Sequence, residues 1–237
     1  MRRVEQIMGM PISIDIPDCE NNAVFTAAFE RLKRIDEIFS TFKPASEVSK
    51  YAVGKVAETE LSPELKEVIK ACKDAGKKTG GYFSAWAAGA FDPNGYVKGW
   101  ALAEAGKVIA IQGYKTYCIG AGGDILACSN SDKTWNIGIQ DPHNKTEILN
   151  KLSISNGAVC TSGSYERGPH ITNPITKKPA DELLSVTIAG PDIVWADILA
   201  TAVYAMGENG ISFMSSQPGY SYLIVDKSGS VNSTLDI

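Results

Sequence analysis

The composition of this 237-residue chain is that of an ordinary globular protein. Hydrophobic residues make up 44% and charged residues 21% of the sequence, which excludes bulk disorder. The 23 basic residues are outnumbered by 27 acidic ones, giving a formal net charge of -4. This balance disfavours nucleic acid or an anionic membrane surface as a partner, because both need clustered Lys and Arg. We also expect no membrane span, since no stretch approaches about 18 consecutive apolar residues.

The N-terminal residues and the cysteines both favour a cytoplasmic protein. Arg2 and Arg3 are followed by no apolar run, so we see no secretory signal and no lipoprotein cysteine near the start. The five cysteines are odd in number and form no Cys-x-x-Cys pair, which argues against a disulfide framework or a zinc site. We therefore expect reduced, mostly buried thiols at Cys19, Cys72, Cys118, Cys128 and Cys160.

Hydrophobic periodicity predicts one strand and three helices in the first half of the chain. Isoleucines alternate with polar residues over 12–16, which is the pattern of a half-buried strand. Apolar residues recur at helical spacing over 23–39. A second helix is expected from the Ser-Pro cap at 62–63 to the glycines at 80–81. A third helix is expected over 97–106.

The second half of the chain is expected to consist mainly of strands. One strong helix over 193–206 interrupts them, and Gly207 is its expected C-terminal stop. Because strands and helices do not alternate strictly, we predict an α+β fold with mixed, largely antiparallel sheets. No repeat or long linker divides the chain, so we expect a single domain over 1–237. The predicted strands are 116–119, 124–128, 135–140, 152–160, 184–189 and 222–225.

Four segments are richer in glycine, small polar residues and Asp than turns require, namely 91–99, 120–124, 161–165 and 170–174. Glycines let the backbone approach a ligand closely, and runs of exposed N–H groups suit phosphate oxygens. Each segment is also explained by a simple turn between strands. The pattern therefore indicates a phosphate-containing ligand only when the segments are taken together.

A carboxylate in the last long helix is the sharper feature. Asp197 and Thr201 are four residues apart and so share one helical face. Their chain neighbours are apolar, and a carboxylate in such surroundings is costly unless it is paired or bound to a metal. Carboxylate and hydroxyl oxygens suit Mg²⁺, which also keeps water and phosphate ligands. The competing interpretation is that Asp197 caps a loop or pairs with a lysine.

Only two histidines are present, His143 and His170. His143 follows Asp141 and Pro142 in an expected turn and is interpreted as a solvated loop residue. His170 lies in one of the four glycine-rich or polar segments, where an imidazole is suited to accept a proton near neutral pH.

Taken in order along the chain, these segments resemble the motifs of the ApbE family of FAD:protein FMN transferases. The resemblance covers nearly the whole chain. Each motif alone is modest, but seven or more in the family's order make chance a poor explanation. The matching segments are 8–11 (MGMP), 40–43 (STFK) with 46–49 (SEVS), 92–99 (DPNGYVKG), 121–124 (AGGD), 135–142 (WNIGIQDP), 161–165 (TSGSY), 170–174 (HITNP) and 196–201 (ADILAT).

The resemblance implies a reaction and a set of site residues. FAD would bind in a cleft with Mg²⁺ on its diphosphate, a threonine hydroxyl of an acceptor flavoprotein would attack the FMN phosphorus, and AMP would leave. Asp197, Thr201 and the carbonyl group of Gly95 are the implied metal ligands, and Mn²⁺ would suit the same oxygens. His170 matches the family's general base. The implied FAD-binding residues are Met8, Phe42, Tyr82, Phe83, Ser84, Asp92, Lys98 and Thr172.

The chain departs from the family pattern at three positions. The family often has Asp where Ser84 stands, Asn at the position of Gly120 and Gly at the position of Lys177. None of these changes removes an implied metal ligand or His170. Two alternatives to transfer remain open at this point: hydrolysis of FAD to FMN and AMP by the same site, and a flavin-binding module without catalysis. The sequence identifies neither the acceptor protein nor the oligomeric state.

Overall fold

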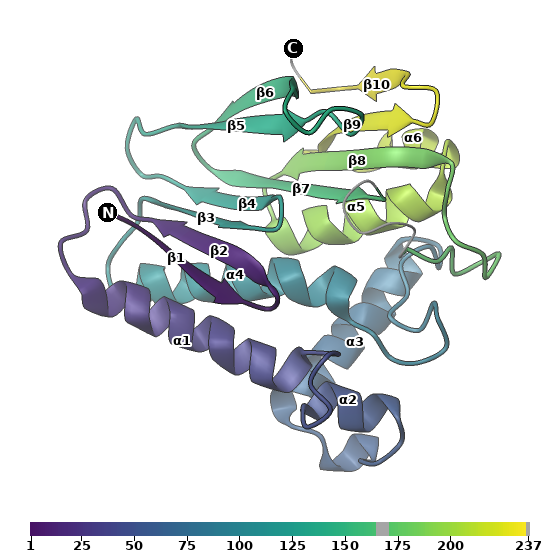
Figure 1. The fold of residues 1–237 in the computed structure, drawn as a ribbon, viewed down its shortest axis with the longest axis horizontal. Helices are drawn as coiled ribbons and strands as arrows, with labels where there is room; N and C mark the ends of the chain where they lie inside the picture. Colours follow the sequence, from purple (N-terminus) through teal and green to yellow (C-terminus); the bar gives the residue numbers. More distant parts are fainter. Residues whose placement is uncertain (165–170, 236–237) are drawn as a thin grey trace.

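An eight-stranded antiparallel sheet forms the centre of the computed structural model, which describes residues 1–164 and 171–235 (Figure 1). Its strand order is β1-β2-β3-β4-β7-β8-β9-β10, and every neighbouring pair is antiparallel. The α+β prediction is therefore confirmed. The strands of this sheet are β1 (Arg2–Ile7), β2 (Met10–Asp15), β3 (Tyr117–Ala121), β4 (Asp124–Cys128), β7 (Gly157–Gly163), β8 (Leu183–Gly190), β9 (Ser221–Asp226) and β10 (Val231–Ser233).

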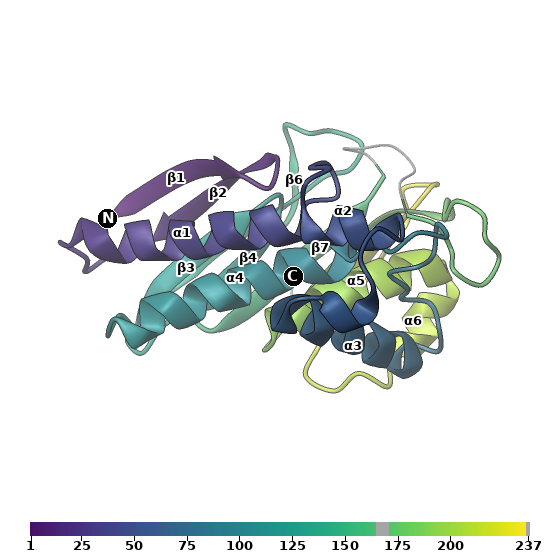
Figure 2. The ribbon, with the colours of Figure 1, turned by 90° about the horizontal axis from the view of Figure 1, so that it is seen from below.

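Helices cover one face of this sheet. Seen from below, α1, α4 and α5 lie side by side under the strands (Figure 2), and each packs against its neighbour. The predicted helices over 23–39 and 193–206 are confirmed. The helix predicted over 97–106 extends further in both directions. The helices are α1 (Asn22–Phe39), α2 (Glu47–Ala52), α3 (Pro63–Lys78), α4 (Asn94–Ile111), α5 (Ile193–Met206) and α6 (Asn209–Met214), with a 3-10 turn at Glu58–Glu60.

The opposite face of the sheet is partly covered by a hairpin of β5 (Trp135–Gln140) and β6 (Ile148–Ile154). Strand β9 shows how the two faces divide. Its Tyr222 and Ile224 belong to the large core under the helices, whereas Leu223 and Val225 pack with Ile139 of the hairpin. The alternation follows from the two-residue repeat of a strand. It makes β9 apolar on both faces.

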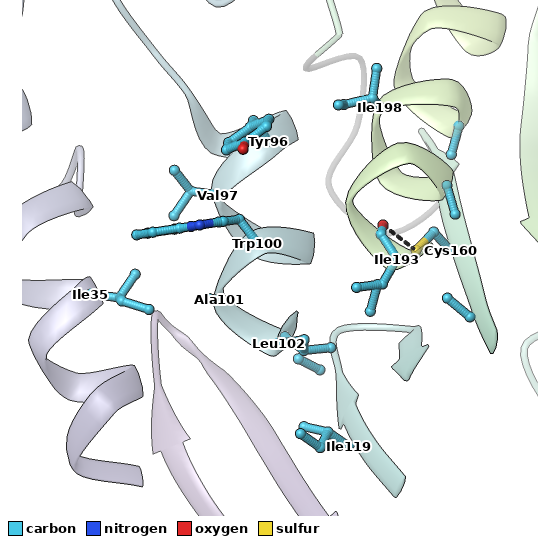
Figure 3. Close-up of a cluster of buried hydrophobic side chains, with 14 of the residues drawn as sticks. Ile35, Tyr96, Val97, Trp100, Ala101, Leu102, Ile119, Cys160, Ile193 and Ile198 are labelled. Atoms are coloured by element: carbon cyan, nitrogen blue, oxygen red, sulfur yellow. Dashed lines mark hydrogen bonds between the residues drawn. The ribbon is translucent and has the colours of Figure 1, made fainter. Parts of the chain in front are cut away.

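The core explains why α4 and α5 are apolar around most of their circumference. Val97 and Trp100 of α4 face Ile35 of α1 (Figure 3), and the other side of α4 packs on α5. The Cys160 thiol of β7 donates to the carbonyl oxygen of Ile193 in α5, 3.7 Å away. A helix covered by other elements on most of its surface has little polar face to present to water. Helix α4 begins at a cavity that is lined by its residues Asn94, Gly95 and Lys98.

The prediction of one strand over 152–160 was wrong. Two strands, β6 and β7, meet there at a turn, and they belong to different sheets. The Asn156 side chain fixes this turn by accepting from the Ser129 N–H at 2.8 Å and donating to the Ser129 carbonyl oxygen at 2.8 Å. Gly157 follows with a φ of 128°, which favours glycine. The short elements β1, α2, α6 and β10 were not predicted.

None of the five cysteines is paired with another, and three of them are buried and two partly buried, in agreement with the predicted burial. Among residues 1–164 and 171–235, no helix combines the length and the apolar character needed to cross a membrane.

Candidate active site

A cavity of about 500 Å³ opens where the sheet, the helices and the hairpin meet. Its floor is formed by the first turns of α4 and the middle of α5, and the β3–β4 turn and β7 form one wall. Strand β5, the β1–β2 turn, the end of α1 with residues 40–42, and residues within the segments 82–88 and 171–174 also line it. This volume is in the range of small-molecule and cofactor sites. Segments from both halves of the chain therefore meet around one space.

The cavity brings together most of the residues that the sequence pointed to. Phe83 is the exception, since it is only 3% exposed and belongs to the core. Its ring lies behind the cavity floor, where a Cβ atom on Gly95 would be 3.4 Å away. His170 lies outside the described residues. The predicted residues that line the cavity are Met8, Phe42, Tyr82, Ser84, Asp92, Gly95, Lys98, Thr172, Asp197 and Thr201.

The three predicted metal ligands lie where α4 crosses α5. Asp197 and Thr201 are one turn apart on α5, and both line the cavity. Gly95 lies against Thr201 so closely that a Cβ atom would be 3.3 Å from Thr201 Oγ1. The Gly99 N–H donates to Asp197 Oδ2 at 2.9 Å. In a regular helix this N–H would bond to the Gly95 carbonyl oxygen, so the two oxygens compete for one donor.

A partly buried lysine lies close to two buried carboxylates beside this crossing. Lys98 Nζ is 2.8 Å from Asp124 Oδ2 and 3.8 Å from Asp197 Oδ1. The Asp124 side chain is fully buried, that of Asp197 is 3% exposed and that of Lys98 is 21% exposed. Asp124 Oδ2 has no hydrogen bond of good geometry among the described residues, so its contact with Lys98 is an ion pair. Asp197 therefore does pair with a lysine, as the competing interpretation expected, but only at the longer of the two distances.

The charges of this cluster follow from its burial. Burial alone would lower the pKa of Lys98, but the carboxylates of Asp124 and Asp197 outweigh that effect and hold the pKa above its ordinary value. Burial raises the pKa of Asp197 to about 7, although Lys98 and the Gly99 N–H oppose the shift. Asp197 is therefore poised to gain or lose a proton near neutral pH, as groups in binding sites often are.

Two side chains at the edge of the cavity are held in unusual settings. Phe42 is 89% exposed although it is a large aromatic residue. Met8 has a φ of 56° in the two-residue turn between β1 and β2, where Gly9 has a φ of 73°. Positive φ costs a non-glycine residue free energy, and strained residues concentrate at binding sites. Both side chains line the cavity.

Sequence reasoning missed several residues of the site. Asp124 was noticed only as part of the 121–124 motif and received no role. Ser162, in the 161–165 motif, has its hydroxyl oxygen 3.4 Å from Thr201 Oγ1. Both residues lie in motifs that the sequence had singled out, 121–124 and 161–165, so this signal could have found them. Segment 135–142 was matched to the family but received no role, although residues 137–140 of β5 line the cavity from a separate sheet.

The three departures from the family pattern have local structural consequences. Ser84 lines the cavity, and its hydroxyl oxygen accepts from the Trp86 N–H at 3.1 Å. Lys177 has a φ of 60°, the conformation that glycine adopts easily. At Gly120, a Cβ atom would lie 3.1 Å from both the Ser13 hydroxyl oxygen and the Ile125 side chain. A larger side chain at Gly120 would therefore crowd two neighbouring strands.

The oxygen atoms at the helix crossing are too few to hold a hard cation alone, so a bound substrate or water would have to supply further ligands. Among residues 1–164 and 171–235, no cluster of three or more His, Cys, Asp or Glu side chains could hold a metal ion. Asp197, the Thr201 hydroxyl and the Gly95 carbonyl supply oxygen donors that fit Mg²⁺ or Mn²⁺, which retain water and phosphate ligands. Any cation there would share its coordination with a substrate.

Comparison with known proteins identifies the family. The sequence model of the ApbE family matches residues 8–90 and 87–224. The fold, with its antiparallel sheet and helical layer, also resembles solved flavin transferase structures. The chain belongs to the ApbE family.

Two solved structures share the fold over nearly their whole length. The ApbE protein from Thermotoga maritima has a TM-score of 0.87 at 23% identity, covering 99% of this chain and 97% of that chain. The flavin transferase ApbE from Vibrio cholerae has a TM-score of 0.83 at 18% identity, covering 98% and 96%. At these identities the likeness concerns the fold alone.

Two curated relatives are similar in sequence over shorter stretches. The FAD:protein FMN transferase of Treponema pallidum (strain Nichols) is 34% identical over 116 residues, which are 44% of this chain and 32% of that protein. The FAD:protein FMN transferase of Vibrio cholerae (serotype O1, O395) is 31% identical over 123 residues, which are 47% and 37%. The chain thus matches about a third of the length of these relatives.

Proposed function

We propose that this chain transfers FMN from FAD to a threonine hydroxyl of an acceptor flavoprotein and releases AMP. The observation that carries this proposal is the meeting of Asp197, Thr201 and Gly95 beside the partly buried side chain of Lys98, in a cavity of cofactor size. Membership of the ApbE family and the names of the curated relatives support it. We propose that residues 1–237 act as one unit, because α1, α4, α5 and β5 all line this cavity.

The cavity floor suits the diphosphate of FAD. Phosphoryl transfer depends chiefly on positioning the substrate and on neutralising phosphate charge. The first turns of α4 line the cavity, and the N-terminal end of a helix favours anions. Lys98 adds a positive charge at the same place. We assign the Gly95 carbonyl, Asp197 and Thr201 as the residues that hold Mg²⁺, which when bound would stabilise developing charge on the phosphate oxygens.

The bond changes are those of a phosphoryl substitution. The threonine oxygen of the acceptor forms a bond to the FMN phosphorus, and the bond from that phosphorus to the bridging oxygen of the diphosphate breaks. The bridging oxygen leaves with AMP. We assign His170 as the group that takes the threonine proton, on the ground of its position in the 170–174 motif. Phe42, Met8 and Tyr82 would hold the rest of FAD at the cavity edge.

The experiment that tests this proposal follows flavin and AMP together. The protein is incubated with FAD, Mg²⁺ and a flavoprotein domain that an established member of the family modifies. Transfer is expected to give a fluorescent acceptor band under denaturing conditions, with one AMP released per flavin attached. Equal AMP release without acceptor would instead show a hydrolase. Bound, intact FAD under all conditions would show a binding module.

An Asp197→Asn variant tests the assignment of the site. The amide retains an oxygen for the Gly99 N–H but loses the charge that a cation needs, so we expect turnover to fall at least about a hundredfold, as for other transition-state charge contacts. Asp192→Asn is the matched control, because Asp192 caps the same helix outside the cavity and Asn caps equally well. Unchanged turnover in Asp197→Asn would refute the metal assignment.

A further inference from the structure

The Lys98 ammonium is shared unequally between two carboxylates. It lies 2.8 Å from Asp124 Oδ2 but 3.8 Å from Asp197 Oδ1, and only the shorter distance is that of a direct charge-assisted contact. Lys98 sits on α4, Asp124 at the start of β4 and Asp197 on α5. The ammonium is therefore turned toward the sheet and away from the helix that carries Asp197.

Asp124 is held in a fixed position for this contact. Its Oδ1 atom accepts from the Thr161 N–H of β7 at 3.1 Å, and its backbone begins β4 directly after the two glycines of the β3–β4 turn. The residue is completely buried. A buried carboxylate is costly without a partner, and at 2.8 Å Lys98 is that partner. The pair is thus close to neutral, which leaves the charge of Asp197 only partly compensated by the more distant ammonium.

The two oxygens of Asp197 are in different situations. Oδ2 accepts from the Gly99 N–H at 2.9 Å, whereas Oδ1 has Lys98 at 3.8 Å. Asp197 also lines the cavity together with Thr201. If the ammonium moved about 1 Å closer, as a direct ion pair requires, it would compete with any cation for Oδ1.

We propose that Asp124 is a positioning residue that holds the Lys98 ammonium off Asp197, so that Asp197 Oδ1 stays open to the divalent cation. This inference rests on the proposed function, because it assumes the metal site at Asp197. Asp124 touches neither the cation nor FAD in this assignment and acts only through Lys98. Loss of its charge would leave Asp197 as the nearest anion for the Lys98 ammonium.

Mn²⁺ binding to the full-length protein, without FAD or acceptor, gives a readout independent of turnover. Free Mn²⁺ is followed by electron paramagnetic resonance. We expect Asp124→Asn to weaken binding at least about tenfold, or ~1.4 kcal/mol, and Asp192→Asn to leave it unchanged. In a Lys98→Gln background the same Asp124→Asn change should weaken binding less than about threefold, because no ammonium remains to move. Equal weakening in both backgrounds would overturn the proposal.

A crystal structure of metal-free Asp124→Asn separates movement of the lysine from simple loss of charge. The distance from Lys98 Nζ to Asp197 Oδ1 should shorten to about 2.8 Å, the length of a direct ion pair. A distance still near the 3.8 Å of the unmodified protein would overturn the proposal.

The double variant Lys98→Gln/Asp124→Asn covers the case in which Asp124→Asn does not fold. It removes both buried charges together, so it should fold and bind Mn²⁺ as the unmodified protein does. Binding weakened by tenfold or more in the folded double variant would contradict the proposal. Unmodified protein that binds no Mn²⁺ would refute the metal site itself, whereas normal binding by both the unmodified protein and Asp124→Asn would refute only the role of Asp124.

Discussion

Gly99 lies directly against Asp197 where α4 crosses α5. The Gly99 N–H donates to Asp197 Oδ2 at 2.9 Å, and a Cβ atom on Gly99 would be 3.0 Å from Asp197 Cβ and 2.9 Å from the Ile193 carbonyl oxygen. Only glycine permits this approach of two helices. The packing of α4 on α5 and the position of the acidic group are therefore one structural feature.

Replacement of Gly99 by alanine should disturb both stability and the site. The added methyl group meets backbone that cannot move alone, so we expect a loss of about 1–3 kcal/mol in the free energy of unfolding, measured with urea, and weaker Mn²⁺ binding. Gly106→Ala on the same helix is the control. Its Cβ would meet only the ends of Tyr117 and Leu126 side chains, so Mn²⁺ binding should be retained. Equal weakening of Mn²⁺ binding in Gly99→Ala and Gly106→Ala would contradict the prediction.

The raised pKa of Asp197 predicts how stability varies with pH in the metal-free protein. Since the pKa of Asp197 is about 7 in the folded state and the ordinary pKa of an aspartate is 3.8, the folded state holds more protons than the unfolded state between these values. Stability contributed by this proton is present at low pH and is lost as pH rises toward 7. Urea midpoints at pH 5 and pH 8 should therefore differ more for the unmodified protein than for Asp197→Asn. Identical pH dependence in the two proteins would contradict the assigned pKa.

Removal of the Phe42 ring should weaken FAD binding without loss of stability. The ring is 89% exposed at the cavity edge, so it contributes little to the core. Stacking on an aromatic ligand is worth about 0.5–1.5 kcal/mol, which predicts a rise of about 2- to 12-fold in the KM for FAD in Phe42→Ala, with kcat little changed. Val53→Ala, at an exposed residue outside the cavity, should leave the KM unchanged. An unaltered KM in Phe42→Ala would remove Phe42 from the site.

A Met8→Asn variant should gain stability and lose affinity for FAD. Met8 has a φ of 56° in a two-residue hairpin turn, and Asn tolerates this conformation better. We expect a gain of about 0.5–1 kcal/mol in unfolding free energy, measured with urea, and a higher KM for FAD because the thioether side chain is lost from the cavity. Lys177→Asn, at a φ of 60° outside the cavity, should gain stability without a change in KM. An equal rise in KM in Met8→Asn and Lys177→Asn would contradict a contact between the Met8 side chain and FAD.

The amino-acid sequence predicted those elements whose hydrophobic pattern lies within their own residues. Strands 124–128 and 135–140 and helix 193–206 were placed at their observed bounds, because alternation and helical periodicity are local properties. The prediction over 152–160 failed because a distant contact, between Asn156 and Ser129, turns the chain there. Strand β10 has only three residues, too few for periodicity to be visible.

The candidate site divides in the same way. The spacing of Asp197 and Thr201 follows from the helical repeat, so the sequence by itself determined that they share a face, and the order of the motifs pointed to the ApbE family. The roles of Asp124 and Gly99 were decided only by the tertiary structure. Charge interactions and close packing act through space, and the partners here are distant in the sequence: Lys98 pairs with Asp124, and Gly99 donates to Asp197.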